Sequence, residues 1–164
     1  MDGVDSVAIE ELSGRQLRLL SWNVGRSSVD RLGNQLTALQ EHTPDIVALQ
    51  EVGVRASRRP RQILRQHGFE YTAHSHEFRS RDFDRASGCA FASRWPMRVL
   101  DPETFDMPFQ HHSLSAVFHT PFGAVEGHTV HVMPGSMVDE DKVEMFEGIY
   151  DRLAVADPPK YRFL

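Results

Sequence analysis

Two polar side chains able to do chemistry lie near the ends of two short apolar runs. Asn23 lies in the run 17–25, and Glu51 lies in the run 45–52. A carboxylate at a strand end with open space in front of it suits a hard divalent cation such as Mg²⁺, which binds few protein oxygens together with water and phosphate. The plain alternatives are an exposed acid at a strand end and a turn asparagine, since most acidic side chains face solvent.

The two runs and the segment between them predict one βαβ unit. Short runs rich in Leu and Val are typical of strands buried on both faces. Residues 28–42 predict an amphipathic helix, because apolar side chains recur at three- and four-residue spacing: Val29, Leu32, Leu36 and Leu39. The strands of such a unit run parallel, so Asn23 and Glu51 are expected at one edge of the sheet, where open α/β sheets bind ligands.

The rest of the chain alternates between further helices and strands. The last helix has an apolar stripe at helical spacing: Val143, Phe146, Ile149, Tyr150 and Leu153. The pattern predicts, in order, a helix over 55–67 ended by Gly68, a strand over 69–73, a polar loop over 74–85, strands over 87–93 and 97–100, a hairpin of 113–118 with 125–132, a helix from about 136 to 154, and the start of a strand at 161–164.

The histidines and the cysteine have narrower roles. His128 and His131 are three residues apart and so lie on opposite faces of a strand, which makes them a poor metal pair. His131, at the strand's end, is the candidate to face the site. The pair at 111 and 112 is interpreted as loop residues rather than ligands. Cys89 lies in an apolar run and is expected in the core rather than as a nucleophile.

Length and composition indicate one ordinary globular domain. The chain has 164 residues, 40% hydrophobic and 25% charged, with a net charge of −5 that gives no indication of nucleic-acid binding. Residues 55–85 nevertheless hold eight arginines against four acids. These arginines are interpreted as a solvated helix face, with attraction to phosphate as the alternative. Residues 1–15 predict a flexible acidic leader ahead of the domain at 16–164.

Several function and location classes are excluded by absent patterns. A single cysteine excludes an internal disulfide framework and fits a reducing compartment. The sequence has no secretory signal and no apolar stretch near the roughly 20 residues of a membrane span, so a cytoplasmic location is expected. It contains no P-loop, no Gly-x-Ser-x-Gly motif, no zinc-ligand spacing and no dinucleotide fingerprint.

Four blocks of the sequence resemble, in order, the endonuclease/exonuclease/phosphatase family. The Trp-Asn block and the Leu-Gln-Glu block are the most diagnostic, and the match extends over about residues 16–164. The blocks are Ser21-Trp-Asn-Val-Gly25, Pro44-Asp-Ile-Val-Ala-Leu-Gln-Glu-Val52, Ser87-Gly-Cys-Ala-Phe-Ala-Ser-Arg-Trp-Pro96 and His128-Thr-Val-His-Val-Met-Pro-Gly-Ser136.

The resemblance implies a phosphoester hydrolase that uses Mg²⁺, with Mn²⁺ as the alternative ion, on a four-layer α/β/β/α sandwich. Glu51 matches the family's metal-binding glutamate, and Asn23 matches the asparagine that lines the metal and phosphate site. His131 matches the histidine that hydrogen-bonds the phosphate. Such a site holds a phosphoryl oxygen on the metal and activates water for in-line attack. The implied partners are phosphoester substrates, either nucleic acid or a small phosphate.

Two of the family's later blocks are absent from this sequence. These are a Gly-Asp-x-Asn block and a final Ser-Asp-His block, which supplies the general base. Residues 161–164 resemble the start of the strand that leads into the first of them. The chain is therefore expected to be the N-terminal portion of the sandwich, lacking its C-terminal strands and helices and having weak or no activity. An exposed sheet edge would also allow self-association.

Two further hypotheses compete with an incomplete hydrolase. In one, the chain is a non-catalytic remnant that binds phosphate-rich ligands or a partner through its arginine-rich segment. In the other, the product does not fold stably alone, which a non-cooperative melt would indicate.

Overall fold

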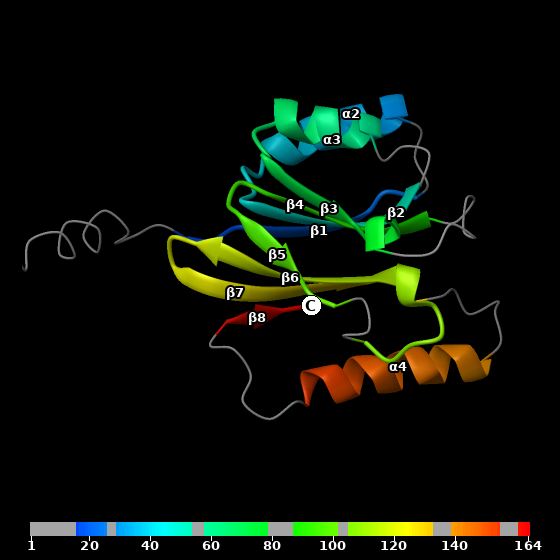
Figure 1. The fold of residues 1–164 in the computed structure, drawn as a ribbon. Helices are drawn as coiled ribbons and strands as arrows, with labels where there is room; N and C mark the ends of the chain where they lie inside the picture. The colour runs from blue at the N-terminus through cyan, green and yellow to red at the C-terminus, as the bar shows by residue number, and fades with distance from the viewer. Residues whose placement is uncertain are drawn as a thin grey trace, which may run out of the picture.

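The described residues form four layers, with two sheets stacked between helices. The computed structural model describes residues 16–25, 29–53, 58–78, 87–101, 105–132, 139–154 and 161–164. Two four-stranded sheets lie face to face, with α2 and α3 over one outer surface and α4 over the other (Figure 1). This arrangement confirms the predicted α/β/β/α sandwich. The predicted leader, 1–15, lies outside the described residues.

The first sheet contains the predicted βαβ unit. Its strands are β1 (Leu19–Asn23), β2 (Ile46–Gly53), β3 (Tyr71–His74) and β4 (Ser87–Ser93), in the order β1-β2-β4-β3. The strands β1 and β2 are parallel, with Asn23 opposite Gln50. The helix α2 (Val29–Gln40) joins them, and α3 (Arg58–Gln66) joins β2 to β3. Both helices lie on the same outer face of the sheet (Figure 1).

The second sheet contains the predicted hairpin. Its strands are β5 (Met97–Val99), β6 (Ser113–Thr120), β7 (Gly123–Val130) and β8 (Arg162–Phe163), in that order. The helix α4 (Asp139–Leu153) lies between β7 and β8 in the sequence, and β8 then pairs parallel to β7. The prediction that a strand starts at 161–164 is therefore confirmed. Two 3-10 helices, η2 (Ser75–Phe78) and η5 (Gln110–His112), follow β3 and precede β6.

Three apolar clusters separate the four layers. Side chains of β2 alternate between two of them, as expected for a strand buried on both faces: Val47 and Leu49 pack toward the helices, and Ile46 and Ala48 pack toward the second sheet. Cys89 lies in the cluster between the sheets and is fully buried, which confirms its assignment to the core. The third cluster joins α4 to the second sheet.

Three predictions about these elements were wrong. The strand β1 lies at the edge of its sheet and is exposed or half-buried along its length, so it is not buried on both faces. The segment that begins at His74 is not simply a loop, since His74 ends β3 and η2 follows. In the stripe predicted on the last helix, only Ile149 is buried, and Met145 and Gly148 occupy the inner face instead.

No helix of the described part of the chain is long and apolar enough to cross a membrane.

Candidate functional site

Glu51 lies in a β-bulge with an unusual backbone conformation. In the pairing of β2 with β4, Leu49 is opposite Ala90 and Val52 is opposite Gly88, so β2 carries one extra residue. Glu51 has a φ of +57°, in the left-handed region that side chains other than glycine rarely adopt. A bulge re-aims a side chain, and strained backbone of this kind gathers at functional sites. The sequence signal for a regular strand ending at Glu51 gave no sign of the bulge.

Asn23 and His131 both contact the Glu51 carboxylate. Asn23 Nδ2 donates to Glu51 Oε1 over 3.0 Å, while Asn23 Oδ1 accepts from the Gly25 amide over 2.9 Å. His131 Nε2 lies 3.1 Å from the same Oε1. The structure thus brings the three predicted site residues together from β1, β2 and the end of β7. Both contacts use Oε1, and the Glu51 side chain is 24% exposed.

Gln50 has a structural role at the site that the sequence did not indicate. Its side chain is buried, and its Nε2 donates to Ser21 Oγ over 3.1 Å and to Thr129 Oγ1 over 2.8 Å. These bonds join β1, β2 and β7, and so link the two sheets next to Glu51. A glutamine inside an apolar run was the only available signal, since its buried amide needs partners.

His112 supports His131 through the main chain. The His131 amide donates to the His112 carbonyl over 2.8 Å, and His112 Nδ1 lies 3.1 Å from the His131 carbonyl oxygen. A carbonyl oxygen only accepts, so His112 Nδ1 carries the proton. Both His111 and His112 are buried in η5. The interpretation of this pair as loop residues is therefore wrong.

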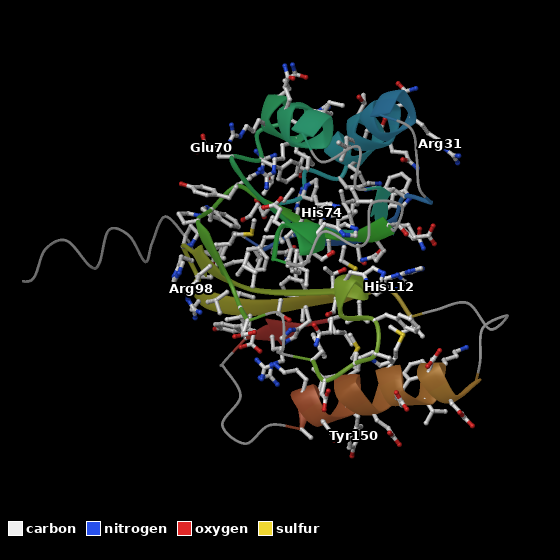
Figure 2. All side chains as sticks on the ribbon, turned by 45° about the vertical axis from the view of Figure 1, so that its right-hand side comes forward. Arg31, Glu70, His74, Arg98, His112 and Tyr150 are labelled. Carbon is white, nitrogen blue, oxygen red and sulfur yellow. The ribbon has the colours of Figure 1, made fainter. Side chains whose placement is uncertain are left out.

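Five histidine rings form a continuous row that ends at Glu51. Neighbouring ring centroids lie between 4.3 and 5.9 Å apart. The row is His74, His76, His111, His112 and His131. Figure 2 shows His74 and His112, from β3 and η5, lying between the helix layers. The row packs the ends of both sheets behind the site.

His74 is held in its neutral form. Burial, followed by the nearby His76, lowers the pKa of His74 from 6.5 to about 4. The hydrogen bonds agree with this direction. His74 Nε2 donates to the Val52 carbonyl over 3.3 Å, and the His76 amide donates to His74 Nδ1 over 3.2 Å, which requires a lone pair on that nitrogen.

His128 belongs to a separate buried cluster on β7. Its Nε2 lies 2.9 Å from Glu126 Oε1, and its Nδ1 lies 2.8 Å from Ser115 Oγ. Arg152 of α4 and Arg162 of β8 also approach Glu126. Burial lowers the pKa of His128 to about 4, against the opposing effect of the Glu126 charge. His128 and His131 therefore have different surroundings, and only His131 contacts Glu51.

An apolar groove of about 600 Å³ adjoins the site. Asn23, Gln50 and His131 line one part of it, and Phe146, Phe163 and Leu164 line another. Residues of β1, β2, β7 and β8 line the groove, together with Phe146 and Ile149 of α4. Site side chains and exposed apolar surface therefore share one opening.

The side chains at Glu51 fit a hard divalent cation of limited protein coordination. Carboxylate and amide oxygens are its preferred ligands, and Mg²⁺ retains several waters. The Asn23 and His131 contacts both use Oε1 and leave out Glu51 Oε2, and Asn23 Oδ1 has a second lone pair. Among the residues that the structure describes, no three His, Cys, Asp or Glu side chains are grouped to hold a metal. The described residues therefore do not form a metal site in which every ligand comes from the protein.

Two arginines of the basic segment can be placed. Arg61 of α3 forms an ion pair with Glu77 of η2, and Arg65 is exposed in the last turn of α3. The side chains of the other six lie outside the described residues: Arg55, Arg58, Arg59, Arg79, Arg81 and Arg85.

The sequence matches one family model over most of its length. Residues 20–159 match the Endonuclease/Exonuclease/phosphatase family. No curated protein sequence matches the chain.

This chain covers little more than half of the length of each of three solved structures of similar fold. An AP endonuclease from Archaeoglobus fulgidus aligns with a TM-score of 0.63 at 20% identity, over 86% of this chain and 53% of its own. A 3′ phosphatase from Neisseria bound to a product DNA hairpin aligns with a TM-score of 0.61 at 20% identity, over 84% of this chain and 51% of its own. TDP2 from D. rerio complexed with single strand DNA product aligns with a TM-score of 0.61 at 14% identity, over 89% of this chain and 57% of its own. At these identities the likeness shows the fold alone.

Proposed function

Because the chain belongs to the Endonuclease/Exonuclease/phosphatase family, we propose that it carries the cation-binding part of a metal-dependent phosphoester hydrolase site. The observation that carries this proposal is the Glu51 carboxylate, aimed by a left-handed bulge and held by Asn23 and His131. The bound cation is Mg²⁺ or Mn²⁺, and the substrate is a phosphoester of a nucleic acid or a small phosphate. DNA in the structures of two similar proteins supports the nucleic-acid option.

Each of the three side chains has a distinct role in this proposal. Glu51 and Asn23 would hold the cation, which supplies positive charge to a phosphoryl oxygen and lowers the pKa of bound water. The Gly25 amide donates to Asn23 Oδ1 and so orients the Asn23 side chain. Asn23 Nδ2 then holds the Glu51 carboxylate in place. His131 Nε2–H is a donor aimed at the carboxylate, 3.1 Å away. A phosphoryl oxygen entering beside Glu51 would accept that hydrogen bond.

We propose that this chain by itself hydrolyses phosphoesters weakly or not at all. The chain spans about half the length of the solved structures that it matches. In the described part of the chain, the carboxylate at the site belongs to Glu51, and it is assigned to the cation rather than to proton abstraction from water. Efficient attack by water needs a base within hydrogen-bond reach.

Titration of the full chain with Mn²⁺, followed by the paramagnetic signal of the free ion, tests the cation site. We expect Glu51→Gln to weaken Mn²⁺ binding at least about tenfold, because it removes the charged ligand but keeps the shape. Glu70→Gln is the matched control, since Glu70 is exposed on another part of the surface. Equal Mn²⁺ affinity in the wild type and Glu51→Gln would refute the proposal. Efficient multiple-turnover hydrolysis of a simple phosphodiester that Glu51→Gln abolishes would refute the statement of weak or absent activity.

A second candidate function is binding of phosphate-rich ligands through α3. Its sequence, RRPRQILRQ, contains no acid, and the helix follows the strand that carries Glu51. We expect binding of single-stranded DNA to weaken steeply with salt and to be reduced by Arg65→Gln. The control is Arg98→Gln, at an exposed arginine on β5. Binding that is insensitive to both salt and Arg65 would exclude this candidate.

A further inference from the structure

The helix α4 presents an apolar stripe to solvent. Val143, Phe146, Tyr150 and Leu153 are 54%, 52%, 73% and 39% exposed. Their spacing of three, four and three residues places them on one side of the helix. Figure 2 shows Tyr150 on the side of α4 that faces away from the sheets. Large exposed apolar side chains gathered on one element mark an interaction surface rather than ordinary surface.

The orientation of α4 is fixed by three separate contacts, so the stripe cannot simply rotate inward. Met145 and Ile149 are buried against Phe105 and Met107. A Cβ at Gly148 would collide with the Asp106 carbonyl, which shows how closely the helix approaches that segment. At the C-terminal end of the helix, Arg152 forms an ion pair with the buried Glu126 of β7. All three contacts lie on the inner side of the helix.

A ridge of acidic side chains runs beside the apolar stripe. Four exposed acids recur at spacings of four, three and four residues, which keeps them on one side of α4: Glu140, Glu144, Glu147 and Asp151. At 100° per residue, this ridge lies next to the stripe and outside the buried face. The stripe also continues into the groove, since Phe146 lines it together with the exposed Leu164.

We propose that the outer face of α4 docks an amphipathic helix of a partner protein, with an apolar face and a flank rich in Lys and Arg. The apolar stripe supplies the buried contact, and the acidic ridge selects the charge of the partner. A second copy of this chain would present the same acids, and like charges oppose that pairing. Membrane-surface helices carry Lys and Arg on their polar face, so the acidic ridge opposes an anionic lipid surface. The proposed docking does not depend on the proposed cation site, although Phe146 lines the groove beside it.

Binding of a designed peptide to the full chain tests the proposal. The probe is a synthetic amphipathic helix of about five turns, at 3.6 residues per turn, with Leu on one face and Lys beside it. The comparison peptides are a version with Glu in place of Lys and a scrambled version of the Lys peptide that has no apolar face. Fluorescence anisotropy is measured at low and high salt. We expect the Lys peptide to bind more tightly than both of the others.

Two variants separate the apolar contribution from the electrostatic one. Replacing Phe146 and Tyr150 by Ser should weaken binding of the Lys peptide by roughly tenfold or more, because aromatic anchors dominate such contacts. Glu144→Lys combined with Glu147→Lys should reverse the preference toward the Glu peptide. The control is Tyr71→Ser, at a partly exposed aromatic residue on β3, which should change nothing.

Four outcomes would overturn the proposal. One is equal binding of the Lys peptide and its scrambled version. Another is Lys-peptide binding that survives both sets of α4 substitutions. A third is a dimer of the chain that the Phe146 and Tyr150 substitutions dissociate, which would assign the surface to a second copy. The fourth is a large loss of melting temperature in the Ser variant but not in Tyr71→Ser, which would mean that the stripe is packed within the chain.

Discussion

At the scale of single residues, the site depends on one strained position. Glu51 has a left-handed backbone near the end of β2, which costs a residue with a Cβ about 1–2 kcal/mol. The bulge aims its carboxylate to where Asn23 and His131 can hold it. A regular strand would pair Glu51 with β4 and point its side chain elsewhere. The folded state therefore retains local strain at the residue whose carboxylate Asn23 and His131 contact.

The first prediction tests this strain through substitution by glycine. We expect the free energy of unfolding of Glu51→Gly to equal that of the wild type or to exceed it by up to about 1 kcal/mol. Glycine adopts a positive φ without steric cost, and its larger loss of entropy on folding offsets part of that gain. Mn²⁺ affinity should fall as in Glu51→Gln. Urea unfolding measures the stability and the titration measures the binding. A loss of more than about 1 kcal/mol would show that the side-chain contacts outweigh the strain.

Thr43→Gly is the matched control for the Glu51 substitution. Thr43 is the other residue besides glycine with a positive φ among the described residues, at +45°. It lies between α2 and β2, away from the Asn23 and His131 contacts. Its replacement should change stability by a similarly small amount and leave Mn²⁺ affinity as it is in the wild type.

At the scale of elements, α4 shows how packing selects one face of a helix. A stripe of five apolar residues predicted the helix, yet only one of them lies on the buried side. The partners that decide the orientation come from other elements: the segment around Phe105 and Met107, and Glu126 of β7. Periodicity predicts that a helix has an apolar side, but it does not say which contacts lie beneath it.

The second prediction concerns the close approach of α4 to Asp106. In an exposed helix interior, Gly→Ala raises stability by roughly 0.5–1 kcal/mol. We expect the opposite sign for Gly148→Ala, a loss of about 1–3 kcal/mol, because the new methyl group collides with the Asp106 carbonyl. Chemical unfolding of the full chain measures this difference.

Gly33→Ala in α2 is the control for Gly148→Ala. The nearest atom to a Cβ at Gly33 is Ile63 Cδ1 at 3.9 Å, an ordinary van der Waals contact. We therefore expect this variant to gain about 0.5–1 kcal/mol. Gains in both variants would show that α4 moves away from Asp106 at little cost.

At the scale of the whole molecule, local patterns predicted the architecture better than the site. The βαβ unit, the hairpin and the strand 87–93 follow from spacing that is visible within short stretches. The bulge at Glu51 and the support of His131 by His112 do not. The first requires a conformation that glutamate rarely adopts, and the second depends on the buried 3-10 helix η5, a segment that the sequence pattern indicated only as a loop.

The third prediction is a loss of stability in mild acid. Burial lowers the pKa of His74 and of His128 to about 4 from 6.5, the value expected in the unfolded chain. Between these two pH values the unfolded chain binds more protons, so the free energy of unfolding falls as pH decreases. Each histidine contributes a slope of about 1.4 kcal/mol per pH unit in that range. Well above pH 6.5 the two histidines are neutral in both the folded and the unfolded chain, and this contribution to the slope vanishes.

His74→Gln provides the comparison for this pH dependence. A glutamine amide can still donate to the Val52 carbonyl but does not titrate, so the slope between pH 4 and 6.5 should fall by about one proton equivalent. Urea unfolding at pH 5 and pH 7.5 measures the slope for both proteins. An unchanged slope in His74→Gln would assign the acid sensitivity to other groups.

The Gln50 amide couples the geometry of the site to the distance between the two sheets. It ties Ser21 and Thr129, and thus fixes the first sheet against the strand whose end carries His131. Glu51 comes from one sheet and His131 from the other, so any sliding of one sheet over the other changes the gap between them. The inter-sheet core and the proposed cation site therefore cannot change independently. A substitution at Phe91 or Phe118, whose rings meet edge to face between the sheets, would alter the site from a distance.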